Sequence, residues 1–209
     1  MNGIPAEIEN LYGFFGFLDK IYIRLRWRLC PFLLIEKFLP RSGKIVDVGC
    51  GYGMLANVIS LRYKERDVYG FDLSRKRIDI ARKTIKNRRN IHFEIKHVRD
   101  LKLNSCDAIV MSDFLHHVSY KDQEHLIRQA CSKLKKKGIM IIQDVDKRPL
   151  WKYLFAANLD RILNCFPRLY YRDVKSWKNM LERNNFNVSP IKADMKLPLP
   201  DVLLICKKK

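Results

Sequence analysis

Short apolar runs alternate with longer stretches of helical periodicity along most of this chain. Runs rich in β-branched residues predict buried strands at 45–48, 68–72, 91–96, 106–111 and 139–145. Between them, apolar residues recur every three or four positions, which predicts helices at 54–63, 75–89 and 120–136. Strands that alternate with helices in this way are typical of an α/β fold built on a parallel sheet.

The C-terminal part continues the pattern with a helix at 173–184 and two further strands near 185–188 and 199–206. Lys135-Lys-Lys-Gly138 predicts the end of the helix at 120–136, because it combines cations in a last turn with a glycine stop.

The first 40 residues form a pattern of their own. Apolar spacing predicts one helix from Ile8 to Leu18 and a second from Ile21, which Pro31 breaks or restarts. Both are rich in aromatic residues, and the second also carries Arg24, Arg26 and Arg28. Two interpretations stay open: a lid that packs on the sheet and closes over a ligand, or an element that rests on a membrane with its basic residues toward the lipid headgroups.

A glycine turn follows the first strand. Gly49, Gly51 and Gly53 stand at alternate positions, where positive φ and close approach of a ligand to the backbone favour glycine. The turn lacks the Lys-Ser/Thr pair of a phosphate-binding loop. Asp47 would repel a phosphate but suits an amino group, and Asp72, at the end of the second strand, is placed to accept from ribose hydroxyls. Together these residues fit a site for S-adenosylmethionine better than a site for a dinucleotide.

Four segments, in order between residues 44 and 146, resemble the motifs of class I S-adenosylmethionine-dependent methyltransferases. Asp47–Gly53 resembles motif I, and Phe71–Ser74 resembles the acidic end of the second strand. Arg99–Leu101 is similar to the loop whose acid faces the adenine amino group. Asp107–Val118 resembles motif IV of the small-molecule branch, which includes the quinone methyltransferases. The order of the motifs identifies the family but not the substrate.

The resemblance implies a Rossmann-like, seven-stranded, mostly parallel sheet with helices on both faces. In such a fold the final strand pairs antiparallel beside the fifth. It further implies an N-terminal helical lid at 1–40 and an S-adenosylmethionine-binding methyltransferase domain at 41–209. A substrate cap is expected at about 149–171, where six aromatic side chains indicate either an apolar acceptor or packing on the lid.

The resemblance also implies which residues hold the cofactor. Asp47 and the glycines would cradle its amino acid part, Asp72 would hold the ribose, and Asp100 would face the adenine. The expected cofactor-binding residues are Asp47, Gly49, Gly51, Gly53, Asp72, Leu73, Asp100, Leu101 and Ser112.

The candidates for catalysis follow the fourth strand. Asp113, His116 and His117 lie where ligands bind in open α/β sheets, and a histidine oriented by a carboxylate accepts a proton near neutral pH. In the alternative interpretation, these residues line the cofactor or serve structure. Methyl transfer from a sulfonium proceeds largely by positioning two reactants in line, so no nucleophilic side chain is required.

Charge and composition limit the partners. The 209 residues include 41 Lys and Arg against 22 Asp and Glu, a net charge of +19. Such a field favours an anionic membrane surface, an acidic carrier protein or nucleic acid, although a solvated basic surface is an equal alternative. The six cysteines are dispersed without metal-ligand spacing, and no metal is expected. A cytoplasmic protein, peripheral at a membrane if the first helices rest there, fits best.

The prediction for function is S-adenosylmethionine-dependent methyl transfer to a small or lipid-like apolar acceptor, presented by a membrane or a carrier. The net charge supports an alternative, RNA methylation, although the fourth strand lacks the Asn-Pro-Pro-Tyr type of sequence found in many nucleic-acid methyltransferases. A second alternative is a non-catalytic scaffold that binds the cofactor, against which the intact acids and glycines weigh.

Overall fold

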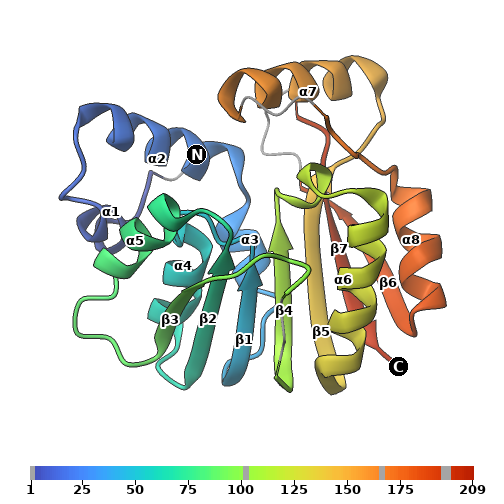
Figure 1. The fold of residues 1–209 in the computed structure, drawn as a ribbon, viewed down its shortest axis with the longest axis horizontal. Helices are drawn as coiled ribbons and strands as arrows, with labels where there is room; N and C mark the ends of the chain where they lie inside the picture. The colour runs from blue at the N-terminus through green and yellow to red at the C-terminus, as the bar shows by residue number, and fades with distance from the viewer. Residues whose placement is uncertain (1–2, 101–103, 165–167, 194–198) are drawn as a thin grey trace.

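The computed structural model describes residues 3–100, 104–164, 168–193 and 199–209, which form one seven-stranded sheet (Figure 1). The strand order is β3-β2-β1-β4-β5-β7-β6, and β7 runs antiparallel to both β5 and β6. The predicted seven-stranded, mostly parallel sheet is therefore confirmed. The strands are β1 (Gly43–Val48), β2 (Arg66–Asp72), β3 (Ile91–Ile95), β4 (Cys106–Ser112), β5 (Leu134–Val145), β6 (Phe186–Lys192) and β7 (Asp201–Lys208).

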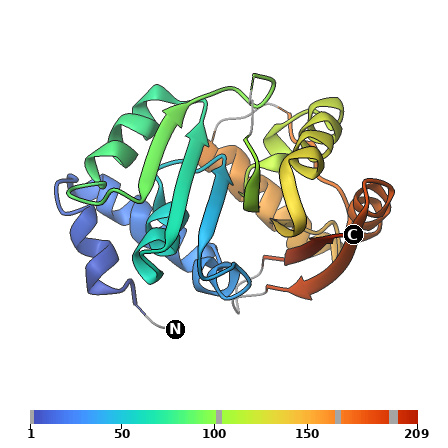
Figure 2. The ribbon, with the colours of Figure 1, turned by 90° about the horizontal axis from the view of Figure 1, so that it is seen from below.

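Helices cover both faces of the sheet (Figure 2). One apolar cluster joins the sheet to α1 (Ala6–Leu11), α2 (Phe17–Leu29), α3 (Phe32–Glu36), α4 (Met54–Arg62) and α5 (Arg75–Lys83). A second cluster joins the opposite face to α6 (Tyr120–Lys133) and α8 (Val174–Arg183). The remaining long helix, α7 (Leu150–Asn164), lies above the edge where the parallel strands end (Figure 1). No helix in the described ranges has the length and apolar character needed to cross a bilayer.

The strand order reverses between β1 and β4. From β1 the chain moves outward to β2 and β3, and it returns to the other side of β1 as β4. In open α/β sheets, ligands bind at this switch point, beyond the carboxyl ends of the strands. The topology therefore directs attention to the ends of β1 and β4.

The N-terminal helices are built into the core. Ile8, Leu11, Trp27 and Ile35 are buried in the same cluster as the strands. Arg66, at the start of β2, is 1% exposed and donates a 2.8 Å hydrogen bond to Glu36 and others to the carbonyls of Pro40 and Leu39. These contacts fix the segment on the sheet, while the division of the chain at residue 40 stays a prediction.

The helix predicted at 75–89 is shorter than expected. Helix α5 ends at Lys83, and Lys86 adopts a φ of +51°. Arg88 does not extend a solvated basic face, because its guanidinium donates to the Asn57 and Ser60 side chains and to the Thr84 carbonyl. The two side chains that accept from Arg88, Asn57 and Ser60, lie on α4, so the periodicity of residues 75–89 alone did not reveal them.

The prediction that Lys135–Gly138 ends a helix is wrong. Helix α6 ends at Lys133, and Leu134 pairs with Cys106 as the first residue of β5. Lys135 places its ammonium 2.9 Å from both carboxylate oxygens of Asp107 on the neighbouring strand. A cationic run before a glycine matches a helix end in sequence, but cross-strand pairing decides the conformation here.

We expect Arg66→Met to lower the free energy of unfolding by about 3 kcal/mol, because the buried Glu36 carboxylate loses the cation at 2.8 Å and keeps the exposed Arg62 at 3.9 Å. Urea denaturation followed by circular dichroism measures this loss. The double variant Glu36→Gln/Arg66→Met removes the buried charge and should recover part of the loss. Single and double variants of equal stability would contradict the assignment of the loss to that charge.

Candidate active site

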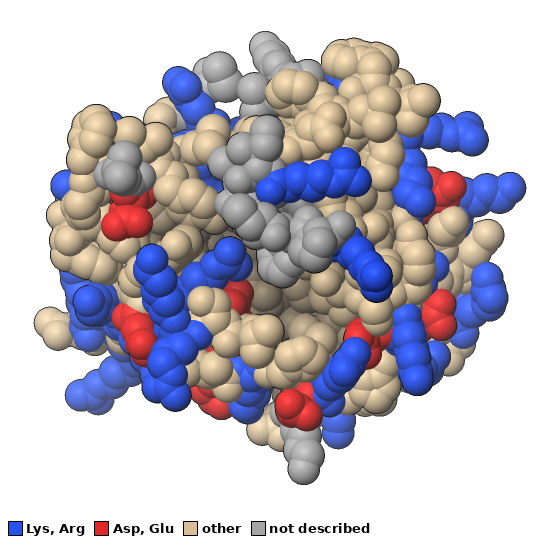
Figure 3. Space-filling model, turned by 45° about the horizontal axis from the view of Figure 1, so that its top comes forward, with Lys and Arg blue, Asp and Glu red and all other residues tan. Residues whose placement is uncertain are grey.

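A pocket of about 440 Å³ opens at the carboxyl ends of β1, β2 and β4. Its wall combines the glycine turn after β1, the ends of β2 and β3, the loop after β4 and two residues of α2, Tyr22 and Arg26. Figure 3 turns this edge of the sheet toward the viewer, where Lys and Arg side chains surround uncharged areas and Asp and Glu are sparse. The pocket therefore lies at the switch point that the topology indicates.

The glycine turn is left-handed at each of its three glycines. Gly49, Gly51 and Gly53 have φ of +75°, +54° and +77°. A Cβ at Gly49 would lie 2.5 Å from the Phe114 ring, and one at Gly53 would lie 2.6 Å from the Phe93 ring, whereas one at Gly51 would meet nothing within 4 Å. Gly51 lines the pocket, so its open space is room for a ligand against the backbone.

Asp72 holds the turn in place. Its Oδ2 accepts a 2.9 Å hydrogen bond from the Gly51 amide, and its Oδ1 accepts a 2.8 Å bond from the Ser74 amide. An ionised carboxylate has about four acceptor positions, so Asp72 keeps capacity for ligand hydroxyls. The neighbouring Leu73 is exposed and also lines the pocket.

Asp47 is a buried carboxyl group in the pocket wall. It is 1% exposed, and its Oδ2 has no hydrogen-bond partner among the described residues. Burial, together with the nearby Asp72 carboxylate, raises the pKa of Asp47 to about 7, against the effect of the Ala56 amide. A buried acceptor without a partner fits a cationic ligand group, because pairing with that group restores the ionised form.

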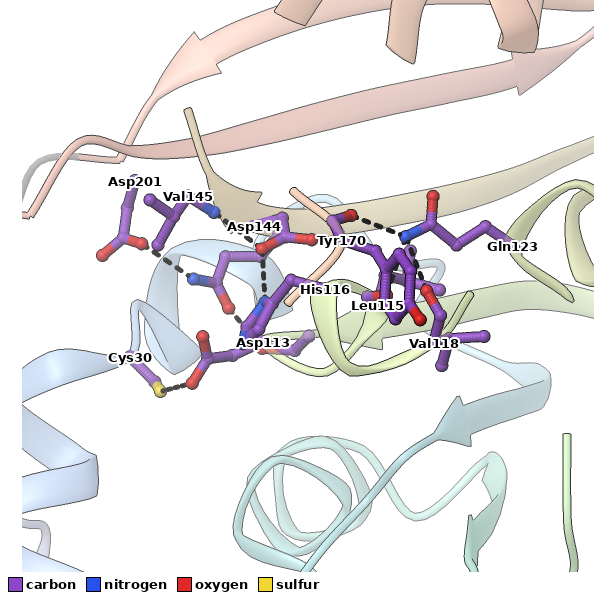
Figure 4. A network of polar contacts seen from close by, with 12 residues as sticks. Cys30, Asp113, Leu115, His116, Val118, Gln123, Asp144, Val145, Tyr170 and Asp201 are labelled. Carbon is purple, nitrogen blue, oxygen red and sulfur yellow. Dashed lines mark hydrogen bonds and ion pairs between the residues drawn. The ribbon is translucent and has the colours of Figure 1, made fainter. Parts of the chain in front are cut away.

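A chain of buried polar side chains links the ends of β4, β5 and β7 and includes Asp201 (Figure 4). Ser112, at the end of β4, donates a 2.7 Å hydrogen bond to Gln143 on β5, and Gln143 donates to Asp201 on β7 at 3.1 Å. Burial, and then the Asp113 carboxylate, raises the pKa of Asp201 well above its usual range. The predicted residue Ser112 therefore lies in the pocket wall, with its hydroxyl directed into the sheet.

Asp113 pairs with a residue that the sequence did not connect to it. Arg26 of α2 forms an ion pair with the Asp113 carboxylate across 87 positions of sequence, and the Cys30 thiol lies 3.9 Å from the same oxygen. Asp113 has a φ of +54°, an uncommon conformation that aspartate tolerates better than most residues. Helix α2 thereby contributes charge to the site.

The two histidines take different positions. His117 lines the pocket. His116 is 1% exposed, and its Nδ1 lies 2.6 Å from the Asp144 carboxylate (Figure 4). Its ring stacks on Tyr171. The two imidazole centroids are 4.2 Å apart. The structure therefore brings His117 and Asp113 to the pocket, whereas His116 lies behind them in the protein interior.

Gln123 of α6 fixes the histidine loop. Its amide nitrogen donates to the carbonyls of Leu115, Val118 and Tyr170 at 2.9–3.0 Å, and the Tyr170 amide donates to the His116 carbonyl at 2.7 Å. Gln123 is fully buried. This residue joins β4, α6 and the segment after α7, a role that only the folded arrangement reveals.

The loop after β3 lies only partly at the pocket. His97, Val98 and Arg99 line the wall, whereas Asp100 is exposed and does not belong to the lining found among the described residues. Leu101 lies outside the described residues. An adenine-facing role for these two residues stays a prediction.

Comparison with known proteins adds the family. A family model described as a methyltransferase domain matches residues 21–190. The chain belongs to this methyltransferase family. Ubiquinone biosynthesis O-methyltransferases are 33% identical over 130 residues in Chromobacterium violaceum and 32% identical over 127 residues in Pelagibacter ubique. These matches include 60% and 59% of this chain and 54% and 51% of the relatives, so the chain spans about half their length.

The fold is that of solved methyltransferases. An S-adenosylmethionine-dependent methyltransferase from Mesorhizobium loti superimposes with a TM-score of 0.69 at 19% identity, over 84% of this chain and 96% of that one. The chain thus belongs to a methyltransferase family and has the fold of class I S-adenosylmethionine-dependent methyltransferases, as its motifs predicted. The open space at Gly51 and the partnerless oxygen of buried Asp47 fit this cofactor.

We expect cofactor affinity to rise with pH through the pKa of Asp47. Only the ionised carboxylate attracts the cofactor's ammonium group, so affinity should increase roughly eightfold between pH 6 and pH 7.5 for a pKa of about 7. Calorimetric titration with S-adenosylhomocysteine measures this change. Asp47→Asn removes the titrating group and should bind weakly, with little pH dependence over that range. An equal pH dependence in both proteins would exclude Asp47 as its source.

Alanine at two glycines should separate binding from stability. Gly51→Ala meets no neighbour, so we expect it to lower the free energy of unfolding by about 1 kcal/mol through its positive φ. It should weaken cofactor binding at least tenfold, on the order of 1.4 kcal/mol, by occupying the cradle. Gly53→Ala also collides with the Phe93 ring and should cost about 3 kcal/mol. Thermal unfolding and calorimetric titration test both variants, and normal cofactor binding by Gly51→Ala would exclude close contact there.

Proposed function

We propose that this methyltransferase transfers the methyl group to a hydroxyl oxygen of a small, apolar, aromatic acceptor of the quinol type. The observation that carries the proposal is the composition of one pocket. The glycine turn and two acids occupy one part of its wall, and His117 lies in the same wall with aromatic residues of separate segments, Tyr22, Phe114 and Tyr170. Cofactor and acceptor then share a single space.

The aromatic part of the wall supports an apolar acceptor. Tyr22 comes from α2, Phe32 from α3, Phe114 from the loop after β4 and Tyr170 from the segment after α7. Aromatic side chains bury large area and stack on planar ligands. An acceptor with an aromatic ring therefore gains contact on several sides, and its hydroxyl group lies near the polar groups at the end of β4.

His117 is proposed as the general base. The cofactor supplies an electrophilic methyl group on a sulfonium, and a hydroxyl oxygen becomes a better nucleophile when its proton is removed. His117 reaches the pocket, whereas the Asp113 carboxylate is balanced by Arg26. His116 is proposed as a positioning residue, because its hydrogen bond with Asp144 fixes the turn that presents His117.

The predicted cofactor-binding residues are proposed to act as a set. Asp47 would pair with the ammonium group, the glycine turn would pack against the amino acid part, and Asp72 would accept from the ribose. The wall position of Leu73 and Ser112 supports their contact with the same ligand. Burial raises the pKa of the Cys50 thiol well above its usual range, so this pocket thiol stays protonated and does not compete as a nucleophile.

Residues 1–40 are proposed as the lid and residues 149–171 as the cap. Tyr22 and Arg26 give the first segment a direct part in the pocket wall, and Tyr170 does the same for the second. Together they restrict entry of water, which would otherwise solvate the reacting groups.

The curated relatives support the choice of acceptor class. The relatives from Chromobacterium violaceum and Pelagibacter ubique are named ubiquinone biosynthesis O-methyltransferases, and their matched segments amount to about half of each protein.

The acceptor class is tested with purified protein, S-adenosylmethionine and a panel of catechols and hydroquinones with and without prenyl tails. Formation of S-adenosylhomocysteine and of a methyl ether supports the proposal. Methylation of RNA without methylation of any phenol would overturn it.

We expect His117→Gln to lower kcat about 100- to 1000-fold through loss of the base, with cofactor affinity changed less than about twofold. His125→Gln, an exposed histidine on α6, is the matched control and should keep full activity. Steady-state rates and calorimetric titration measure both effects. A His117→Gln rate within about threefold of the parent protein would mean that positioning alone drives transfer.

A further inference from the structure

Helix α7 exposes large apolar side chains to solvent. Four of its exposed side chains are large and apolar: Leu150, Trp151, Leu154 and Phe155 have exposed fractions of 65%, 62%, 50% and 48%. Their spacing places all four on one face of the helix. Surface helices of water-soluble proteins normally turn such a face toward the core.

The fully buried residues of α7 are small. Ala156 and Ala157 pack in a separate cluster with Val145, Tyr171 and Leu199, and Tyr153 and Leu159 are partly buried against it. The helix therefore contacts the body of the protein through this side and leaves four large apolar residues on its other side exposed. A contiguous exposed apolar face of this kind indicates an interaction surface rather than a fault of packing.

The N-terminal helices carry a second exposed apolar group. Phe14, before α2, and Phe17 and Ile21, on α2, are 47%, 78% and 47% exposed. Figure 1 shows α2 and α7 on the same side of the molecule, above the carboxyl ends of the parallel strands. The pocket opens at that edge, and α2 itself supplies Tyr22 and Arg26 to its wall.

Cations accompany both apolar groups. Lys20, Arg24 and Arg28 are exposed on α2, and Arg148 and Arg161 are exposed before and on α7. Two lysines lie against the aromatic rings: the Lys83 ammonium is 5.7 Å from the Phe14 ring centroid, and Lys152 is 5.7 Å from that of Trp151. Figure 3 shows basic side chains around uncharged areas on this side. Apolar residues flanked by Lys and Arg are typical of helices that lie in the interface of an anionic membrane.

From this arrangement we propose that α7 and α2 form a docking surface for a bilayer that contains anionic lipids. The apolar side chains enter the boundary between headgroups and acyl chains, while the cations pair with lipid phosphates. Charge favours a bilayer over a second copy of this chain, because two copies of net charge +19 repel each other. The surface deepens the proposed function, since an apolar acceptor dissolved in the bilayer then meets the pocket at its mouth.

The first experiment is vesicle flotation, which does not depend on methyl transfer. The full chain should float with vesicles of phosphatidylcholine mixed with phosphatidylglycerol and stay in solution with phosphatidylcholine alone. Trp151→Ser/Phe155→Ser should weaken binding to the mixed vesicles at least tenfold. Leu33→Ser, an exposed leucine on α3 outside the surface, is the control and should bind within about twofold of the parent protein.

Charge is tested with matched pairs. Lys20→Glu/Arg28→Glu on the surface should abolish flotation. Lys175→Glu/Lys178→Glu, exposed lysines on α8, change the net charge equally and should leave most of the binding intact. Equal effects of the two pairs, or unchanged binding by Trp151→Ser/Phe155→Ser, would mean general charge attraction and overturn the proposal. So would a dimer in sedimentation velocity that the same apolar variant dissociates, without vesicle binding by the parent protein.

A rate measurement separates this proposal from the function on which it builds. Trp151 and Phe155 belong to the cap range but do not line the pocket in the part of the chain that the structure describes, so Trp151→Ser/Phe155→Ser should lose at least tenfold more rate on a long-chain acceptor held in mixed vesicles than on a short, water-soluble acceptor. If the parent protein floats but methylates no phenol, the docking surface stands and the proposed acceptor fails. If both proteins act equally on the vesicle-held acceptor, the docking surface fails and the acceptor stands.

Discussion

The carboxylate of Asp72 joins the ends of two neighbouring strands into one binding site. One oxygen holds the amide of Gly51 in the turn after β1, and the other holds the amide of Ser74 at the start of α5. Gly51, which is left-handed, places no side chain between this part of the turn and the pocket, and the carboxylate pairs the Gly51 amide. Every other part of the site, from Asp47 to the residues of α2, is arranged around a turn that Asp72 stabilises.

The polar groups behind the pocket are unusually deep for a protein with so basic a surface. Asp47, Asp144 and Asp201 are each at most 5% exposed, while the excess of Lys and Arg is carried largely outside. This separation places carboxyl groups near the expected position of the cofactor's positive charge, and it places cations where a membrane brings negative charge. The same chain thus presents opposite electrostatic characters to its two proposed ligands, at the sheet edge and at the outer helices.

Local sequence patterns predicted the parts of this structure whose physical cause is local. The strands, the glycine turn and the acid at the end of β2 follow from residue type and spacing, and the structure has each of them. Two sets of contacts join segments that are distant in sequence: the ion pair of Arg26 with Asp113, and the hydrogen-bonded chain from Ser112 to Asp201. Local periodicity could not predict either of them. At Lys135 the local pattern gave a wrong prediction. The sequence around it is typical of a helix end, but Lys135 lies in β5 and its ammonium pairs with Asp107 on the adjacent strand. His116 and His117 are identical in sequence terms, and only the packing of Tyr171 and Asp144 distinguishes them.

The pairing of Arg26 with Asp113 has a kinetic consequence. If α2 moves away from the pocket, it must separate Arg26 from the Asp113 carboxylate in a partly buried setting. Such a movement would be slow compared with the rotation of an exposed side chain. In the proposed enzyme, the exchange of spent cofactor for fresh cofactor past α2 would then depend on this ion pair, whereas the methyl transfer itself would not.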